Sequence, residues 1–326
     1  MKYKIVINII YNSVIILIAF FLFEGGARLF FSDIKIPMTQ QSLLKNGVYY
    51  DSQGLKPNSS GLSSDVLKYV DEFGFWKYSS GKKSKNKILF LGDSVTMGIG
   101  VENDSTFAGI LNNSSNGLAI LNTSLIGYSS HDYKNIVKKL IEDEKNKIGI
   151  NCIFIFWCLN DVYSNLPVSD SPEIVNDSFI NKIIIFLRNN SYFYHLLKSI
   201  VSDRPKAYYF YDKTFYNIQN THFKQSIDDL IEIDRIANEY NLSIELFLLP
   251  YEYQLRDNGY ELRNSPQRLL SKNLKNTKIK VRDCSTFFNI VDDLGEYYLY
   301  GDGIHFSYRG HKAMAEYIEA LRKKLH

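Results

Sequence analysis

The chain has 326 residues, 45% of them hydrophobic and 22% charged, which is enough apolar material for one large globular domain or two modest ones. It carries 38 basic and 35 acidic residues, and no lysine-arginine run is interleaved with aromatic residues, so we set nucleic-acid binding aside. The three cysteines (Cys152, Cys158 and Cys284) have neither CxxC nor Cys/His metal spacing. We therefore expect them in the core and expect no metal site.

The N-terminal segment is predicted to be a membrane anchor over residues 1–30. Residues 5–23 are dominated by Ile, Leu, Val and Phe and approach the ~20 residues that a bilayer-spanning helix needs. Lys2 and Lys4 precede them, and no other basic residue comes before Arg28, so the positive-inside rule predicts a cytoplasmic N-terminus and an exported remainder. A cleaved signal peptide and a buried core helix are the alternatives.

Residues 31–86 are rich in Ser, Gly, Asn and Lys, and we interpret them as a stem that links the anchor to the main domain, residues 87–326. Within this stem, residues 69–76 are too apolar for a pure linker. We expect this part to pack on the main domain.

From residue 87 onward, short apolar strands alternate with helical segments, the pattern of a doubly wound parallel sheet. Residues 163–221 are longer than a simple crossover, and we interpret them as an insertion near the site. The aromatic cluster at 208–211 is assigned to packing rather than to ligand binding. The predicted strands are 88–91, 118–121, 153–157, 242–249 and 278–281, and the predicted helices are 131–145, 179–200, 223–240 and 307–325.

Polar residues follow four of these strands. Because the carboxyl ends of parallel strands share one edge of a sheet, loops far apart in the sequence should converge there. The residues concerned are Ser94 after the first strand, in KILFLGDSVTMGIG, Gly127 after the second, Asn160-Asp161 after the third, and Asp302 and His305 after the fifth.

Ser94 is the candidate nucleophile. A serine hydroxyl needs an adjacent base, and histidine suits because its pKa lies near neutral. His305 is the one histidine expected on a loop at this edge with a carboxylate close by; Asp302, three residues earlier, can hold its imidazole in the required tautomer. The Asp-x-x-His pair alone is equally typical of a helix cap or half a metal site, and Ser94 makes the catalytic interpretation stronger.

A tetrahedral intermediate also needs donors for its oxyanion. The amides of Ser94 and Gly127 and the side-chain amide of Asn160 are the candidates. Gly127 as a simple turn residue and Asn160 as a helix cap remain alternatives. We interpret Asp93 and Asp161 as structural.

The chain resembles the SGNH/GDSL hydrolases in four blocks. These are LGDSVTMG with Ser94, IGYS with Gly127, CLND with Asn160, and DGIH with Asp302 and His305. Cys158 stands where the third block of that family usually has glycine. The resemblance covers residue 87 to the C-terminus, and it implies a flavodoxin-like three-layer α/β/α sandwich with a parallel five-stranded sheet, and ester chemistry without metal or cofactor. The segment Phe73-Gly74-Phe75 is similar to one in the stem of membrane-anchored bacterial members.

Two other motifs do not fit. Thr96 replaces the second glycine of the Gly-x-Ser-x-Gly elbow, and Gly98-Ile99-Gly100 lacks the third glycine of a dinucleotide fingerprint. We expect a membrane-anchored, extracytoplasmic serine esterase for acyl esters, by analogy O-acetyl esters of envelope carbohydrates. The alternatives are an O-acetyltransferase for a cell-surface glycan that uses the same triad, and a noncatalytic glycan-binding protein on the same scaffold.

Overall fold

Five parallel strands form the centre of the computed structural model, which describes residues 2–31, 34, 41–81, 84–114, 117–163, 179–288 and 293–323. Numbered as they occur along the chain, the strands lie in the order 2-1-3-4-5, which is the flavodoxin-like order. Branched and aromatic residues fill the strands because both faces of the sheet are covered. The strands are β5 (Asn86–Gly92), β6 (Leu118–Asn122), β7 (Ile150–Trp157), β8 (Ser243–Leu248) and β9 (Lys280–Asp283).

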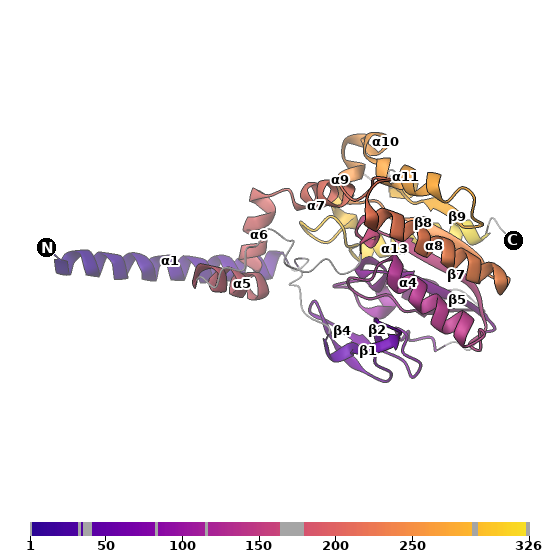
Figure 1. Cartoon of the computed structure of the whole chain (residues 1–326). Coiled ribbons are helices and arrows are strands. Elements are labelled where there is room, and N and C mark those ends of the chain that lie inside the picture. Colours follow the sequence, from indigo (N-terminus) through magenta and orange to yellow (C-terminus); the bar gives the residue numbers. More distant parts are fainter. Residues whose placement is uncertain are drawn as a thin grey trace.

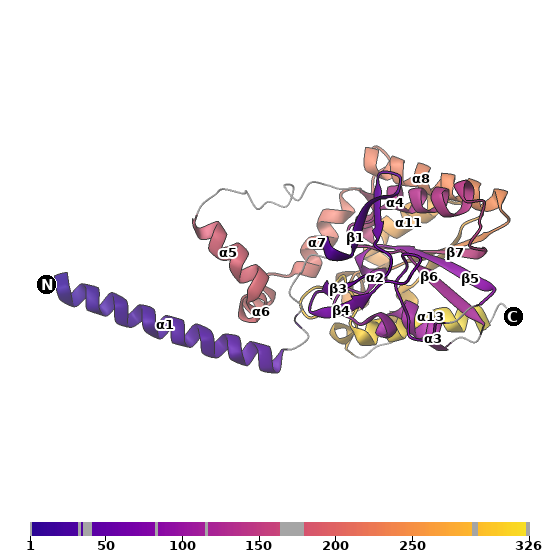
Figure 2. The same cartoon turned by 90° about the horizontal axis from the view of Figure 1, so that it is seen from below.

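Helices cover the two faces of this sheet and complete three layers (Figure 2). On one face lie α3 (Phe107–Ser114) and the closing helix α13 (Tyr308–Lys323). On the other lie α4 (Ser130–Val137), α8 (Thr221–Glu239) and α11 (Ser265–Asn273). The α/β sandwich expected from the sequence is confirmed.

Phenylalanine rings tie the central strands together. The ring centroids of Phe90 on β5 and Phe156 on β7 are 4.8 Å apart, and those of Phe156 and Phe247 on β8 are 5.0 Å apart. All three side chains are fully buried. Each buried ring contributes about 1.5–3 kcal/mol of stability through apolar burial. This cluster of rings therefore holds β5, β7 and β8 together close to the ends from which the site is built.

The segment predicted as one helix over 179–200 forms two. Helix α5 (Phe179–Asn190) ends at an asparagine pair, and α6 (Tyr192–Val201) begins after Ser191, whose side chain accepts a hydrogen bond from the Tyr194 amide. This serine cap satisfies a free amide and favours a new helix start. Helix α7 (Arg204–Lys213) follows, with Pro205 in its first turn, and contains the aromatic cluster.

At the N-terminus, the helix α1 (Lys2–Phe30) extends away from the sheet (Figures 1 and 2). It is long and apolar enough to cross a membrane, and its most apolar stretch is not buried. A signal sequence near the N-terminus would have the same length and apolar composition.

The stem contains two small antiparallel hairpins. The first pairs β1 (Leu44–Tyr49) with β2 (Ser52–Leu55), and the second pairs β3 (Ser60–Ser63) with β4 (Val66–Tyr69). Next to them Trp76 is buried, and its indole nitrogen donates to the Ser124 carbonyl of the main domain at 2.8 Å.

Candidate active site

The turn that carries Ser94 is built by its immediate neighbours. Strand β5 ends at Gly92, and the short helix α2 (Ser94–Met97) begins at once, capped by the Asp93 side chain, which accepts a hydrogen bond from the Val95 amide at 2.9 Å. A Cβ at Gly92 would lie 2.0 Å from the Thr96 hydroxyl, so this tight turn requires glycine. Ser94 is therefore held at the carboxyl end of a central strand.

The loop before α13 brings a histidine and a carboxylate to this serine. Ser94 Oγ lies 2.8 Å from His305 Nε2, and His305 Nδ1 lies 2.9 Å from Asp302 Oδ1. Asp302 Oδ1 also accepts the amides of Ile304 at 2.9 Å and His305 at 2.7 Å, so the carboxylate is fixed by its own loop. The three side chains proposed as a triad from the sequence lie together.

This loop is not the direct end of the fifth strand. Between β9 and Asp302 lie α12 (Ser285–Phe288) and the turn Leu294–Tyr297, and an antiparallel bridge between Tyr298 and Phe306 closes the base of the loop. Asp302 and His305 lie in the loop between the two residues of this bridge, and the loop returns to the edge of the sheet at Ser94.

The pKa values of the two charged partners are shifted in opposite directions. Burial alone would raise the pKa of Asp302, but the charge and hydrogen bond of His305 outweigh it and lower that pKa to about 2. Burial alone would lower the pKa of His305, but the Asp302 carboxylate outweighs it and leaves the pKa above its usual value of 6.5. Asp302 is therefore an anion at neutral pH and favours a charged imidazole.

Asn160 lies in the turn Leu159–Val162, which follows β7, the strand next to β5. Its Nδ2 donates to Asp93 Oδ2 at 3.1 Å. An amide nitrogen carries two protons, so one remains for a ligand. Ser94 and Asn160 thus flank the point where the strand order reverses, where open α/β sheets bind ligands.

Gly127 lies in the loop that joins β6 to α4. Its φ of 80° is in the left-handed region, and no other group lies within 4 Å of the position that a Cβ would occupy. The positive φ fits the alternative that Gly127 is a turn residue. The open space beside it also leaves room for a ligand to approach its backbone.

Cys158 and Asp161 have structural roles in the third block. Cys158 has φ −94° and ψ 161°, an extended conformation open to any residue, so its replacement of the usual glycine introduces no backbone strain. Asp161 is fully buried and accepts from the Tyr133 hydroxyl at 2.8 Å and the Cys158 amide at 2.9 Å. Burial raises the pKa of Asp161 well above its usual value.

A buried cluster behind Asn160 was not anticipated from the sequence. Tyr251, which follows β8, donates to Asp212 Oδ2 at 2.7 Å, and its hydroxyl lies 3.2 Å from Asn160 Oδ1. Tyr163 donates to the other oxygen of Asp212 at 2.7 Å. Burial raises the pKa of Asp212 to about 6, although both hydroxyls favour its charged form. The oxygen of the Asn160 amide therefore faces Tyr251 and its nitrogen faces Asp93.

The position of Tyr251 could have been predicted from the sequence, because it follows the end of the fourth strand by three residues and so lies at the same sheet edge as the predicted residues. Asp212 carried none: it lies in an insertion, and only packing brings α7 to this edge.

The stem contacts the C-terminal end of α2, the helix that begins at Ser94. Lys68, on β4, is fully buried, and its Nζ donates to the Met97 carbonyl at 3.1 Å. Burial lowers the pKa of Lys68 to about 7, although Glu102 favours its charged form. The hairpin β3–β4 is thereby joined to α2.

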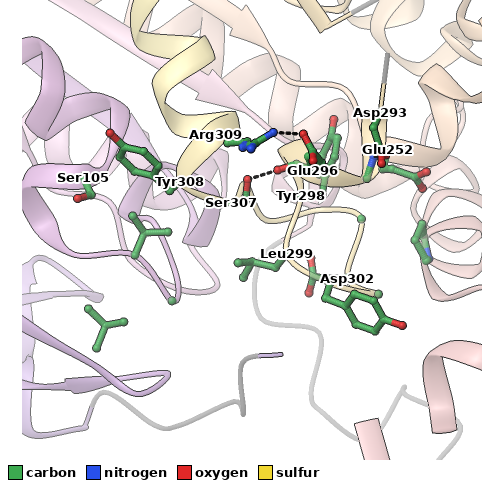
Figure 3. A pocket seen from close by; sticks show the side chains of 18 of the residues that line it. Ser105, Glu252, Asp293, Glu296, Tyr298, Leu299, Asp302, Ser307, Tyr308 and Arg309 are labelled. Atoms are coloured by element: carbon green, nitrogen blue, oxygen red, sulfur yellow. Dashed lines mark hydrogen bonds and ion pairs between the residues drawn. The ribbon is translucent and has the colours of Figure 1, made fainter. Parts of the chain in front are cut away.

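A cavity of about 940 Å³ is lined in part by the loop that carries Asp302 (Figure 3). Asp302 is among its lining residues, as are Ser105, Glu296 and Arg309, and Arg309 is paired with Glu296. Ser94 and His305 are not among the residues that line it. Among the described residues, no group of three or more His, Cys, Asp or Glu side chains has the arrangement of a metal site.

No protein-family model and no curated protein sequence matches the chain. Several solved structures are similar in fold. TesA is 14% identical over 74% of this chain and 100% of its own, with a TM-score of 0.42. The psychrotrophic esterase EstA from Pseudoalteromonas sp. is 13% identical over 74% and 98%, with a TM-score of 0.42. A putative lipolytic protein of the G-D-S-L family from Desulfitobacterium hafniense DCB-2 is 16% identical over 72% and 97%, with a TM-score of 0.42.

Proposed function

We propose that this chain is a serine ester hydrolase of the SGNH/GDSL type that works through an acyl-enzyme on Ser94. The observation that supports it is the continuous contact from Ser94 Oγ to His305 Nε2, at 2.8 Å, and from His305 Nδ1 to Asp302, at 2.9 Å. A nucleophile, a base and a group that orients the base are the three groups of the serine catalytic triad.

In the proposed mechanism, Ser94 Oγ attacks the ester carbonyl while His305 Nε2 takes its proton. The imidazolium is stabilised by Asp302 and then gives the proton to the departing alcohol, leaving an acyl group on Ser94. Water, activated by His305, releases the acid. The amides of Ser94 and Gly127 and the free Nδ2 proton of Asn160 stabilise the oxyanion in both steps.

We further propose that the substrate is an acyl ester, with O-acetyl esters of envelope carbohydrates as the class to test first. Helix α1 would act as a single-pass anchor, with the N-terminus in the cytoplasm and the catalytic domain outside it. Lys2 and Lys4 before the apolar stretch support this orientation. Transfer of the acyl group to a glycan hydroxyl in place of water would use the same three residues.

Ser94→Ala tests the proposal directly. The full-length variant, purified in detergent, should lose more than about 10⁴-fold in kcat/KM for a small chromogenic acetate ester, because no other group can form the acyl-enzyme. Ser105→Ala, at the neighbouring cavity, should keep wild-type turnover. Equal turnover in Ser94→Ala and wild type would overturn the assignment.

Two further measurements separate the competing functions. A fluorophosphonate probe should label wild type and not Ser94→Ala, whereas an unreactive Ser94 would favour a noncatalytic glycan-binding protein. Incubation with an acetylated glycan, with and without an acceptor glycan, distinguishes release of acetate from transfer by mass spectrometry.

A further inference from the structure

Helices α5 and α6 expose more apolar surface than water-facing helices of this length usually do. None of the 12 residues of α5 is buried, and Phe179, Ile183 and Phe186 share one face of it by their spacing. A helix this short is marginal in water without a covered apolar face. The exposed apolar side chains are Phe179, Ile180, Ile183, Ile185 and Phe186 on α5 and Leu197, Ile200 and Val201 on α6, each between 43% and 79% exposed.

The charges of this segment have one sign. Residues 179–201 contain Lys182, Arg188 and Lys198 and no aspartate or glutamate. A helix with an apolar face and only basic charges is typical of segments that lie in the surface of an anionic bilayer. Interfaces with other proteins are depleted in lysine, whereas this segment contains Lys182 and Lys198, and a surface that faces only water carries fewer large apolar side chains.

The corner between α5 and α6 is fixed to the end of α1. Glu24 on α1 accepts from the Tyr192 amide at 3.1 Å and the Phe193 amide at 3.0 Å, both at the start of α6. Arg28, one turn further along α1, donates to the Asn190 carbonyl at the end of α5 at 2.7 Å. One charged pair therefore caps both helices.

Aromatic rings continue this contact. Phe193 stacks on Phe23 at 5.1 Å between centroids, and Arg28 lies 4.7 Å above the Tyr192 ring. Aromatic and basic side chains together are typical of the level at which a spanning helix leaves the hydrocarbon. In both views α5 and α6 lie on the side of the domain that faces α1 (Figures 1 and 2).

We propose that α5 and α6 form a second membrane contact, with their apolar faces embedded in the headgroup region of the bilayer that α1 crosses. This inference rests on the proposed anchor role of α1. The bilayer is favoured as the occupant because the apolar faces are joined directly to α1 and carry only basic charge.

The loop that carries Asp302 packs on α6 and on α7, the helix that follows it. A Cβ at Gly301 would lie 2.8 Å from Cβ of Ser199 on α6, and one at Gly303 would lie 2.3 Å from Cγ of Pro205 on α7. The backbone on either side of Asp302 thus packs directly on these helices. Ester bonds presented close to the bilayer surface would be within reach of the site.

Depth-dependent tryptophan quenching tests the contact in the intact protein. The full-length chain is reconstituted in vesicles of phosphatidylcholine and phosphatidylglycerol in equal parts, with bromine on the acyl chains either close to the headgroup or near the chain end. Phe186→Trp should be quenched several-fold more than wild type, most strongly by bromine close to the headgroup. The two native tryptophans, Trp76 and Trp157, are buried in the protein and supply the background.

Ile231→Trp is the matched control, because Ile231 is an exposed apolar residue on α8, at 45% exposure, away from α1. Leu17→Trp reports α1 itself. If Leu17→Trp is quenched while Phe186→Trp matches Ile231→Trp, the second contact is refuted and another occupant, such as a second copy of the chain, covers this face. If Leu17→Trp is not quenched, the anchor role fails and this inference fails with it; the Ser94 assignment stands apart from both results.

Discussion

In the proposed mechanism, His305 has to be uncharged to accept the Ser94 proton, so its protonation state would control the first step. The Asp302 carboxylate raises the pKa of His305 above 6.5. Below that pKa the imidazole already holds a proton and cannot act as the base. The same carboxylate that stabilises the imidazolium in the transition state therefore restricts activity at acid pH.

The pH dependence of kcat/KM should show this. We expect activity to fall as the pH drops, with a midpoint above 6.5, because the raised pKa extends the charged form of His305 upward. Asp302→Asn should move that midpoint to lower pH and lower kcat by about 10⁴-fold, because the carboxylate no longer favours the imidazolium. Asp293→Asn is the control: Asp293 lines the same 940 Å³ cavity as Asp302 but does not contact His305, so this change should leave the midpoint unchanged. A wild-type midpoint below 6.5 would contradict the assignment.

Helix α7 and Tyr251, the residue before α9 (Glu252–Leu255), contact the site from outside the four sequence blocks. Asp212 on α7 holds the Tyr251 hydroxyl next to Asn160, and Asp93 holds the other side of the same amide. In the proposed mechanism Asn160 contacts the oxyanion, and Tyr251 and Asp212 would act as positioning residues that keep its amide from rotating.

Tyr251→Phe should lower kcat about tenfold with KM unchanged. Loss of an oxyanion donor costs roughly 10²–10³-fold, and a donor that is present but less well oriented should cost less. Tyr260→Phe is the matched control: Tyr260 is also buried and donates to a carboxylate, Asp283, but at the far edge of the sheet. A loss of stability without any change in kcat would assign Tyr251 a purely structural role.

The regular elements of the sheet were predictable because their signals are local. The apolar run of β5 and its break at Gly92 specify a strand and a turn, and four polar positions at strand ends sufficed to predict the contact of Ser94 with His305. Two features depend on tertiary packing and had no local signal: the return of the chain to Asp302 after β9, and the position of Asp212. The hairpins of the stem are local pairings, but their short strands contain Ser and Gly and were interpreted as part of a linker. The division of residues 179–200 at Ser191 was readable from the serine cap and was missed because the apolar spacing continues through it.

For the molecule as a whole, the stem is more than a spacer between α1 and the sheet. Lys68 reaches from the second hairpin to the carbonyl end of the nucleophile helix and is buried there without a carboxylate bonded to it. The pKa of Lys68 is lowered to about 7, so between pH 7 and its usual value of 10.5 the unfolded chain binds more protons than the folded one. Stability should therefore rise with pH in this range.

Lys68→Met should remove this rise. We expect wild type to gain stability relative to the variant as the pH increases from 7 to 9, by up to ~1.4 kcal/mol per pH unit, while the difference stays constant below pH 7. Thermal unfolding of the full-length proteins in detergent measures it, and Lys224→Met, on the exposed side of α8, should run parallel to wild type. A difference that does not change with pH would show that burial does not lower the pKa of Lys68.

The Ser94 hydroxyl and the His305 imidazole come from positions 211 residues apart, and the imidazole lies on the loop that precedes the last helix. During synthesis the serine leaves the ribosome long before its base exists. A chain that ends before residue 305 therefore lacks the proposed base, whatever the conformation of the turn at Ser94. In the proposed mechanism, ester hydrolysis can begin only when the loop before α13 has emerged and has reached Ser94, so a partly translated chain would not yet be a hydrolase.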